Sequence, residues 1–245
     1  GPNNRPEACA SDVAVQEVLD AVEYVKTQAR SDADRIYLLG ASGGGHMALM
    51  LATRAPRLWA GVSAWSSITD LAAWHGQTDD GRAGRFPEMI EAVCGGRPGA
   101  SEKVDAEYRR RSPLFHLAKA GGVSIDLNVG IRDGHEGAVP ISHSLLAFNE
   151  LAKINGHGAE VLSGEQIETL AGDARVPEAL GSAQRDMADA APNQRVLMRR
   201  SAGPVRLSVL DGGHDLDVRP AFEWLAEQKR SGSVALTTAP SNRPG

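Results

Sequence analysis

The sequence predicts an α/β fold in which a mostly parallel β-sheet is covered by helices. Short apolar runs recur along the chain, and segments whose apolar residues follow helical spacing lie between them. Alternation of this kind is typical of a parallel sheet with helices on both faces. At 245 residues and 42% hydrophobic content, the chain can bury one sizeable core. We therefore expect one domain over residues 1–230.

The elements are expected in a regular order. The first is a helix that Ser11 or Asp12 caps, because the apolar residues that follow recur at helical spacing. Strands are expected where apolar residues run together, at about 35–40, 59–65, 124–131 and 205–211. The main helices are expected between and after these strands, at about 45–55, 140–154 and 219–229.

Two insertions interrupt this order. Residues at about 68–118 contain Gly and Pro punctuation, and short helices are expected near 84–93 and 105–118. Residues at about 160–203 are polar and are expected to be helical at 164–171 and 177–190. Residues 231–245 are rich in Ser, Thr, Pro and Gly, a composition that predicts a disordered tail.

Composition argues against several function classes. The net charge is −5 with both signs interspersed, so we expect neither a nucleic-acid nor a membrane partner. No apolar run approaches the length of a membrane span.

The two cysteines, Cys9 and Cys94, lack metal-type spacing, and we expect no metal and no cofactor. They could form a disulfide in an oxidising compartment or stay as thiols. The sequence leaves the compartment open, either cytoplasmic or exported after removal of an upstream signal peptide.

The most informative motif is G-A-S-G-G at residues 40–44. It follows a short apolar run and leads directly into a helix-forming run, as in the strand, turn and helix of a nucleophile elbow. Such a turn holds a serine hydroxyl above the end of the sheet, so Ser42 is the candidate nucleophile. We expect glycine at positions 40 and 44 because side chains there would collide across the tight turn.

A serine hydroxyl needs a base to remove its proton and a carboxylate to orient that base. In sheets of this type these partners follow the serine on later strand ends, in the order acid and then histidine. His214 comes directly after the last expected strand and is the candidate base. Asp133 is the first carboxylate past the strand at about 124–131 and is the favoured acid, while Glu136 is the competing acid.

Stabilisation of the oxyanion requires two hydrogen-bond donors. The N–H of Gly43, directly after the nucleophile, is expected to supply one. The second usually comes from a loop after an earlier strand, and no H-G-G-G segment precedes Ser42. His46 is expected to pack near the site as a helix residue. Trp65 and Trp74 could line an acyl or sugar pocket, although burial in the core is the more ordinary expectation for tryptophan.

These motifs resemble the catalytic domain of the prolyl oligopeptidase-like (S9-type) branch of the α/β-hydrolases. The resemblance rests on residues 34–44, on R-S-P at 111–113 and on G-G-H at 212–214, and it covers about residues 1–229. It implies that Ser42, Asp133 and His214 form the triad. In most members the aspartate lies three residues before a valine, a spacing that Glu136 holds here.

The resemblance also implies a C-terminal portion of such a domain, with about four of the usual eight strands. The strands that complete the oxyanion hole would be missing, and one sheet edge would be open. A second copy of the chain or a missing N-terminal segment would cover that edge. The expected function is a serine hydrolase that acts on a small ester or peptide substrate through an acyl-enzyme. It would be either a prolyl oligopeptidase-like peptidase or a short-acyl esterase of acetyl type, and the alternative is an inactive or partner-dependent module.

Overall fold

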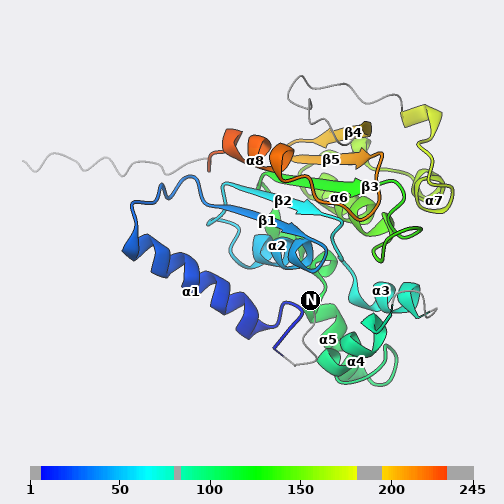
Figure 1. Ribbon diagram of the computed structural model, residues 1–245, viewed down its shortest axis with the longest axis horizontal. Helices are drawn as coiled ribbons and strands as arrows, with labels where there is room; N and C mark the ends of the chain where they lie inside the picture. Colours follow the sequence, from blue (N-terminus) through cyan, green and yellow to red (C-terminus); the bar gives the residue numbers. More distant parts are fainter. Residues whose placement is uncertain (1–6, 80–83, 181–194, 231–245) are drawn as a thin grey trace, which may run out of the picture.

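The computed structural model describes residues 7–79, 84–180 and 195–230. A five-stranded sheet forms its centre, with strand order β1-β2-β3-β5-β4 (Figure 1). The first four strands of this order run parallel, and β4 pairs antiparallel with β5 at one edge. The strands are β1 Tyr37–Ala41, β2 Gly61–Trp65, β3 Ile125–Gly130, β4 Val196–Ala202 and β5 Val205–Leu210. The expected parallel α/β sheet is therefore confirmed.

Helices cover the two faces of the sheet unequally. On one face, α2 (Gly43–Arg54) and α6 (Ser142–Ile154) pack against the strands and enclose the largest apolar cluster. The helix α1 (Asp12–Gln28) packs on α2, and α7 (Gly164–Gly172) packs on α6. On the other face, α8 (Val218–Glu227) closes a smaller cluster around Trp65. Successive strand residues point to opposite faces, so both clusters draw on the same strands.

The first insertion forms a separate layer beyond the end of β2 (Figure 1). It contains α3 (Leu71–Thr78), α4 (Phe86–Cys94) and α5 (Glu102–Arg111), which share their own apolar cluster. The helix expected at about 105–118 ends at Arg111, because Pro113 has no N–H to continue it. Two short 3-10 helices follow, η1 (Pro113–Phe115) and η2 (Leu117–Ala120).

The second insertion contains a strand that the sequence analysis did not predict. Helix α7 lies where it was predicted, but residues 196–202, for which no element was expected within the insertion, form the edge strand β4. Gly203, at φ 61°, turns the chain back into β5. Two 3-10 helices, η3 (Gly158–Glu160) and η4 (Glu178–Leu180), flank α7. The helix expected at 177–190 lies mostly outside the described residues, as does the predicted tail at 231–245.

The loops that follow the parallel strands all begin at the same edge of the sheet. Residue 42 follows β1, residue 131 follows β3 and residue 211 follows β5, so three loops meet at the carboxyl ends of these strands. This is the edge at which ligands bind in open α/β sheets. Within the described ranges, no helix combines the length and apolarity that crossing a membrane requires.

Candidate active site

Ser42 occupies the turn between β1 and α2 in a strained backbone conformation. Its φ of 56° and ψ of −121° lie in a region that non-glycine residues rarely adopt. Two backbone hydrogen bonds hold it there: its N–H donates to the Trp65 carbonyl at 2.8 Å, and its own carbonyl accepts from the N–H of His46 at 2.9 Å. Strand, turn and helix thus follow one another as the motif predicts.

The glycines around Ser42 have different steric roles. A Cβ on Gly40 would collide with the Gly44 carbonyl, which agrees with the expectation for position 40. A Cβ on Gly44 would meet nothing within 4 Å, so the expectation for position 44 is wrong. The second tight position is Gly45, where a Cβ would collide with Ser67 Oγ. The turn therefore needs glycine at 40 and 45, because the Gly44 carbonyl packs against position 40, and Ser67 Oγ and the Trp65 carbonyl pack against position 45.

The loops after β3 and β5 bring Asp133 and His214 together. His214 Nδ1–H donates a hydrogen bond to Asp133 Oδ2 at 2.9 Å. Asp133 is 1% exposed, and its other oxygen accepts from the N–H of Val139 at 3.3 Å. The hydrogen bond and charge of Asp133 raise the pKa of His214 against the opposing effect of burial. The carboxylate is thus positioned to orient the imidazole and to stabilise its protonated form.

Two further glycines, which the sequence alone did not single out, allow this close approach. A Cβ on Gly130 would collide with the Gly213 carbonyl, so the His214 loop can cross the end of β3 only above a glycine. A Cβ on Gly137 would collide with Asp133 Oδ1 and would lie 2.6 Å from His214 Cβ. The sequence signal that could have identified Gly137 is its position in the same short loop as the candidate acid Asp133.

Glu136, the alternative acid, makes different contacts. Its Oε2 accepts from Arg132 Nε at 3.0 Å, and its side chain is 61% exposed. Arg132 also binds Asp211 at 2.7 Å, so Glu136 belongs to a surface ion-pair group. Of the two candidate carboxylates, Asp133 is the one hydrogen-bonded to His214.

Ser42 is not hydrogen-bonded to this pair in the structure. Within the described part of the chain, no hydrogen bond joins Ser42 Oγ to the His214 ring. The serine follows β1 while its two partners follow β3 and β5, and β2 separates β1 from β3 in the sheet. Catalytic hydrogen bonds are often long before substrate binds, so this arrangement is compatible with a triad that tightens on binding.

The N-terminus of α2 supplies a donor site beside Ser42. Gly43 begins the helix, and N–H groups in a first turn have no acceptor within the helix. The aligned peptide dipoles place partial positive charge there, and the first turn contains no acidic residue to neutralise it. Gly43 can therefore stabilise negative charge next to Ser42 Oγ. The described residues do not identify a second donor.

Two buried histidines, His46 and His143, form hydrogen bonds with the loop after β2. His46 donates from Nδ1 to the Ile68 carbonyl at 3.1 Å, and burial lowers its pKa to about 4. His143 accepts at Nδ1 from the N–H of Thr69 at 3.2 Å, and burial lowers its pKa to about 4 as well. Both imidazoles are therefore neutral near pH 7, and they link α2 and α6 to the loop after β2.

The two tryptophans are core residues. Trp65 is 2% exposed and donates its indole N–H to Ser63 Oγ at 2.9 Å. Trp74 is 2% exposed and donates to the Ala138 carbonyl at 2.7 Å, which ties α3 to the loop that carries Asp133.

A cavity of about 490 Å³ lies along the loop that carries Asp133, between residues 134–140 and the α3–α4 layer. In the described part of the chain, no three His, Cys, Asp or Glu side chains form a potential metal site.

Comparison with known proteins places this chain in a family. The sequence model of the prolyl oligopeptidase family matches residues 9–164, a range that contains Ser42 and Asp133 and ends before His214. The rice (Oryza sativa subsp. japonica) acylamino-acid-releasing enzyme 2 is 30% identical over 149 residues, which are 58% of this chain and 18% of that protein.

Solved structures of similar fold include a Mycobacterium tuberculosis puromycin-hydrolyzing peptidase, with a TM-score of 0.52 and 23% identity over 62% of this chain and 21% of that one. A Pyrococcus horikoshii acylaminoacyl peptidase gives a TM-score of 0.49 and 20% identity over 62% of this chain and 22% of its own. The chain spans about a fifth of the length of these relatives. The first of these structures supports the α/β-hydrolase type of fold, and the family match covers more than half of the chain. The chain therefore belongs to the prolyl oligopeptidase family of serine hydrolases.

Proposed function

We propose that this chain carries the catalytic residues of a hydrolase that cleaves a peptide or ester bond through an acyl-enzyme. Ser42 attacks the carbonyl carbon while His214 accepts the hydroxyl proton, and His214 then protonates the leaving group. Asp133 orients the imidazole, and the N–H of Gly43 stabilises the oxyanion. The observation that carries the proposal is the 2.9 Å bond between buried Asp133 and His214 at the sheet edge that also presents the strained Ser42.

The proposed substrate is a peptide with an acylated N-terminal residue. One relative is named as an acylamino-acid-releasing enzyme, which supports this class over a simple ester. Short-acyl esters of acetyl type are the second candidate, because the described residues include no identified group that grips a peptide. N-acetyl-aminoacyl p-nitroanilides and p-nitrophenyl acetate, assayed side by side, separate the two by the ratio of their kcat/KM values.

A fluorophosphonate probe tests the nucleophile directly. We expect the folded wild-type chain to be labelled at Ser42, and Ser42→Ala to abolish labelling while leaving the circular dichroism spectrum unchanged. Ser31→Ala is the matched control, since Ser31 is exposed and lies in the loop before β1, and it should label like the wild type. Equal labelling of Ser42→Ala and wild type would remove Ser42 from the mechanism.

The competing proposal is an inactive or partner-dependent module. It is supported by the single oxyanion donor, Gly43, that the described residues identify. Absence of labelling in a well-folded wild-type protein would favour this second proposal and contradict the first.

A further inference from the structure

A second cavity lies at the opposite end of the sheet from Ser42. It has a volume of about 580 Å³ and opens where β2 and β3 begin. Trp59 and Ala60 precede β2, and Val123 and Ser124 precede β3, so the two strand starts form its floor. Because β2 is five residues long, the cavity is about 15 Å from the carboxyl ends of the strands. It is therefore separate from the candidate active site.

The side chains around this cavity carry an excess of positive charge. Its lining residues include four basic side chains and no acidic one, although the whole chain has a net charge of −5. The four are Arg57, Lys119, Lys229 and Arg230. They come from three segments that are distant in the sequence: the α2–β2 loop, η2 and the residues after α8. The fold alone brings these charges together.

One of the four cations is structural and three are uncompensated. Arg230 donates to Asp34 Oδ1 at 2.8 Å and to the Arg57 carbonyl at 2.9 Å, which fixes the end of α8 against the start of the sheet. Within the described ranges, the side chains of Arg57, Lys119 and Lys229 form no ion pair and no hydrogen bond. All three side chains are exposed, so solvent screens their mutual repulsion, and an anion at the cavity would be attracted by each of them.

We propose that this cavity binds a small anion that carries two or more negative charges on phosphate or carboxylate groups. The volume lies within the range of about 300–1,000 Å³ typical of small-molecule sites. Arg57 offers the planar donor pair that suits such oxyanions, and the two lysines add point charges. The buried Trp59, Ala60 and Val123 form an apolar floor, which suits a ligand with a carbon skeleton better than a bare ion.

Calorimetric titration with inorganic pyrophosphate at low ionic strength tests the site on the full chain. We expect saturable one-to-one binding that weakens as salt is added. The triple variant Arg57→Gln, Lys119→Gln, Lys229→Gln should lose affinity at least about tenfold, because charge-assisted hydrogen bonds are removed. A parallel titration with citrate distinguishes carboxylate from phosphate selectivity.

The matched control is the triple variant Lys26→Gln, Lys103→Gln, Arg109→Gln, which removes the same charges on α1 and α5 away from the cavity. It should bind pyrophosphate like the wild type. Equal loss in both triple variants would show non-specific attraction and overturn the proposal. So would absence of binding by the wild type to both anions, or binding to RNA or anionic vesicles without binding to either small anion. The measurement needs no catalytic activity, so its result is independent of the role of Ser42.

Discussion

At the residue scale, two carboxylates stand three positions apart on the loop after β3 in opposite environments. Asp133 is buried against His214, whereas Glu136 is exposed and bound to Arg132. A buried carboxylate interacts strongly with an imidazole because little solvent screens the pair, while an exposed ion pair contributes little. Their different surroundings predict different consequences of substitution.

We expect Asp133→Asn to lower kcat by about three to four orders of magnitude, since the amide favours the wrong imidazole tautomer. Glu136→Gln should change kcat by less than about threefold, because only a surface ion pair is lost. Steady-state assays on the substrate that the wild type prefers measure both, and the rate of fluorophosphonate labelling provides a second readout. A large loss in Glu136→Gln with activity retained in Asp133→Asn would transfer the role of acid to Glu136.

The pH dependence follows from the raised pKa of His214. The base must be neutral, so activity should fall on acidification with an apparent pKa above the ordinary histidine value of about 6.5. The charged pair adds stability that is fully present below the unfolded-state pKa and is lost as pH rises through the higher folded-state pKa.

An NMR titration of the His214 ring checks this expectation. Asp133→Asn should lower the His214 pKa, because it removes both the hydrogen bond and the charge that raise it, and Glu136→Gln should leave the pKa unchanged. An unaltered His214 titration in Asp133→Asn would contradict the assignment of Asp133 as the source of the shift.

At the scale of elements, the junction of β1 and α2 depends on close backbone contacts. Gly40 faces the Gly44 carbonyl, Gly45 faces Ser67, and Gly44 faces open space. The strain at Ser42 is maintained only while these contacts stay close. The alternation of strands and helices was readable from apolar periodicity, but these contacts join segments that are distant in sequence, so periodicity does not reveal them.

We expect Gly40→Ala and Gly45→Ala each to lower the free energy of unfolding by about 2 kcal/mol or more, because the added methyl group overlaps backbone or a buried hydroxyl. Gly44→Ala should be neutral or stabilising by up to about 1 kcal/mol, since alanine favours helix and has room there. Urea denaturation of the three variants measures the difference. Equal destabilisation by all three would contradict the assignment of the tight positions.

Strand β4 is an element that the sequence analysis did not predict. Residues 196–202 are half-buried at the sheet edge and contain two consecutive arginines, so neither a continuous apolar run nor a clear alternation is present. Arg199 donates to Ser208 Oγ at 3.0 Å, and Arg200 donates to Glu160 at 3.1 Å. The strand is therefore stabilised by pairing with β5 and by polar contacts, which local sequence does not encode.

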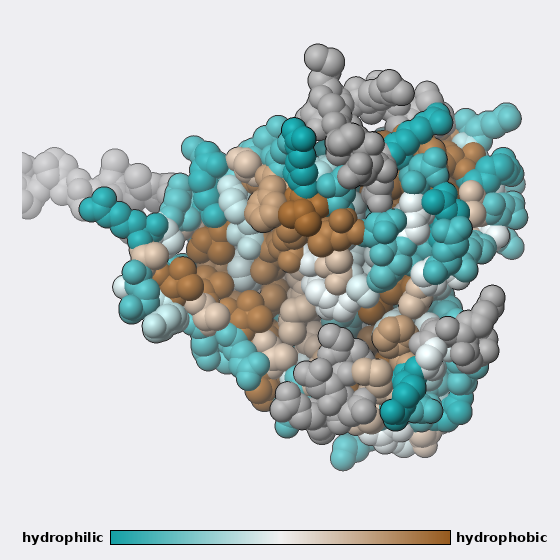
Figure 2. Space-filling view, viewed as in Figure 1, coloured by the Kyte–Doolittle hydropathy of each residue, from teal (hydrophilic) through white to brown (hydrophobic). Residues whose placement is uncertain are grey.

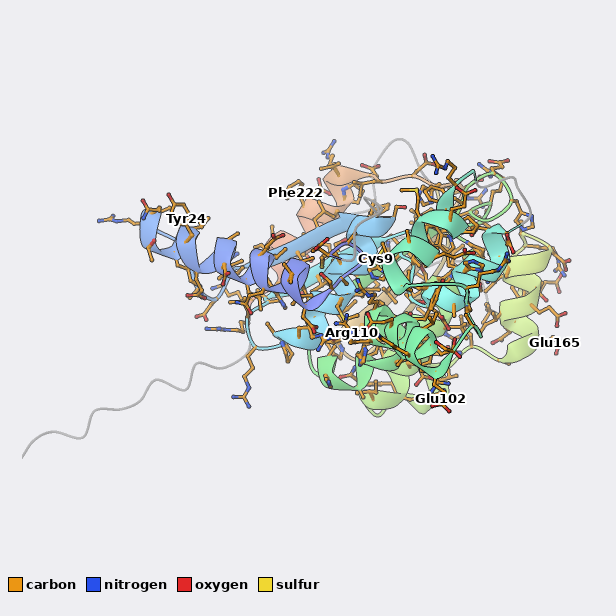
Figure 3. All side chains as sticks on the ribbon, turned by 90° about the horizontal axis from the view of Figure 1, so that it is seen from below. Cys9, Tyr24, Glu102, Arg110, Glu165 and Phe222 are labelled. Atoms are coloured by element: carbon orange, nitrogen blue, oxygen red, sulfur yellow. The ribbon has the colours of Figure 1, made fainter. Side chains whose placement is uncertain are left out.

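At the scale of the whole molecule, the free edge of β1 lies beside exposed apolar surface. Among the described residues β1 pairs only with β2, and all five of its residues are partly exposed. Figure 2 shows apolar surface over α1 and the β1 side of the sheet. Tyr24 on α1 is 66% exposed and Phe222 on α8 is 60% exposed, and Figure 3 shows them on the same side of the molecule with β1 between their helices. An unpaired edge strand with apolar flanks favours association.

For the chain on its own we propose that a second copy covers this edge. Light scattering coupled to size-exclusion chromatography should show association that increases with concentration. Tyr24→Glu with Phe222→Glu should weaken it at least about tenfold, because two charges enter the apolar contact. Leu146→Glu, at a 42% exposed position on α6, is the control and should leave it unchanged. A monomer at every concentration would exclude the second copy and favour another segment as the cover of the edge.

The sequence by itself determined the α/β class, the turn at Ser42 and the order of the candidate site residues. These depend on local periodicity, on glycine next to a serine, and on the rule that parallel strands end at one edge. The tertiary structure decided which carboxylate contacts His214, which glycines are sterically required, and that four basic residues from three segments surround one cavity. Each of these depends on contacts between segments far apart in the chain, whose distances follow from packing and cannot be read from spacing along the sequence.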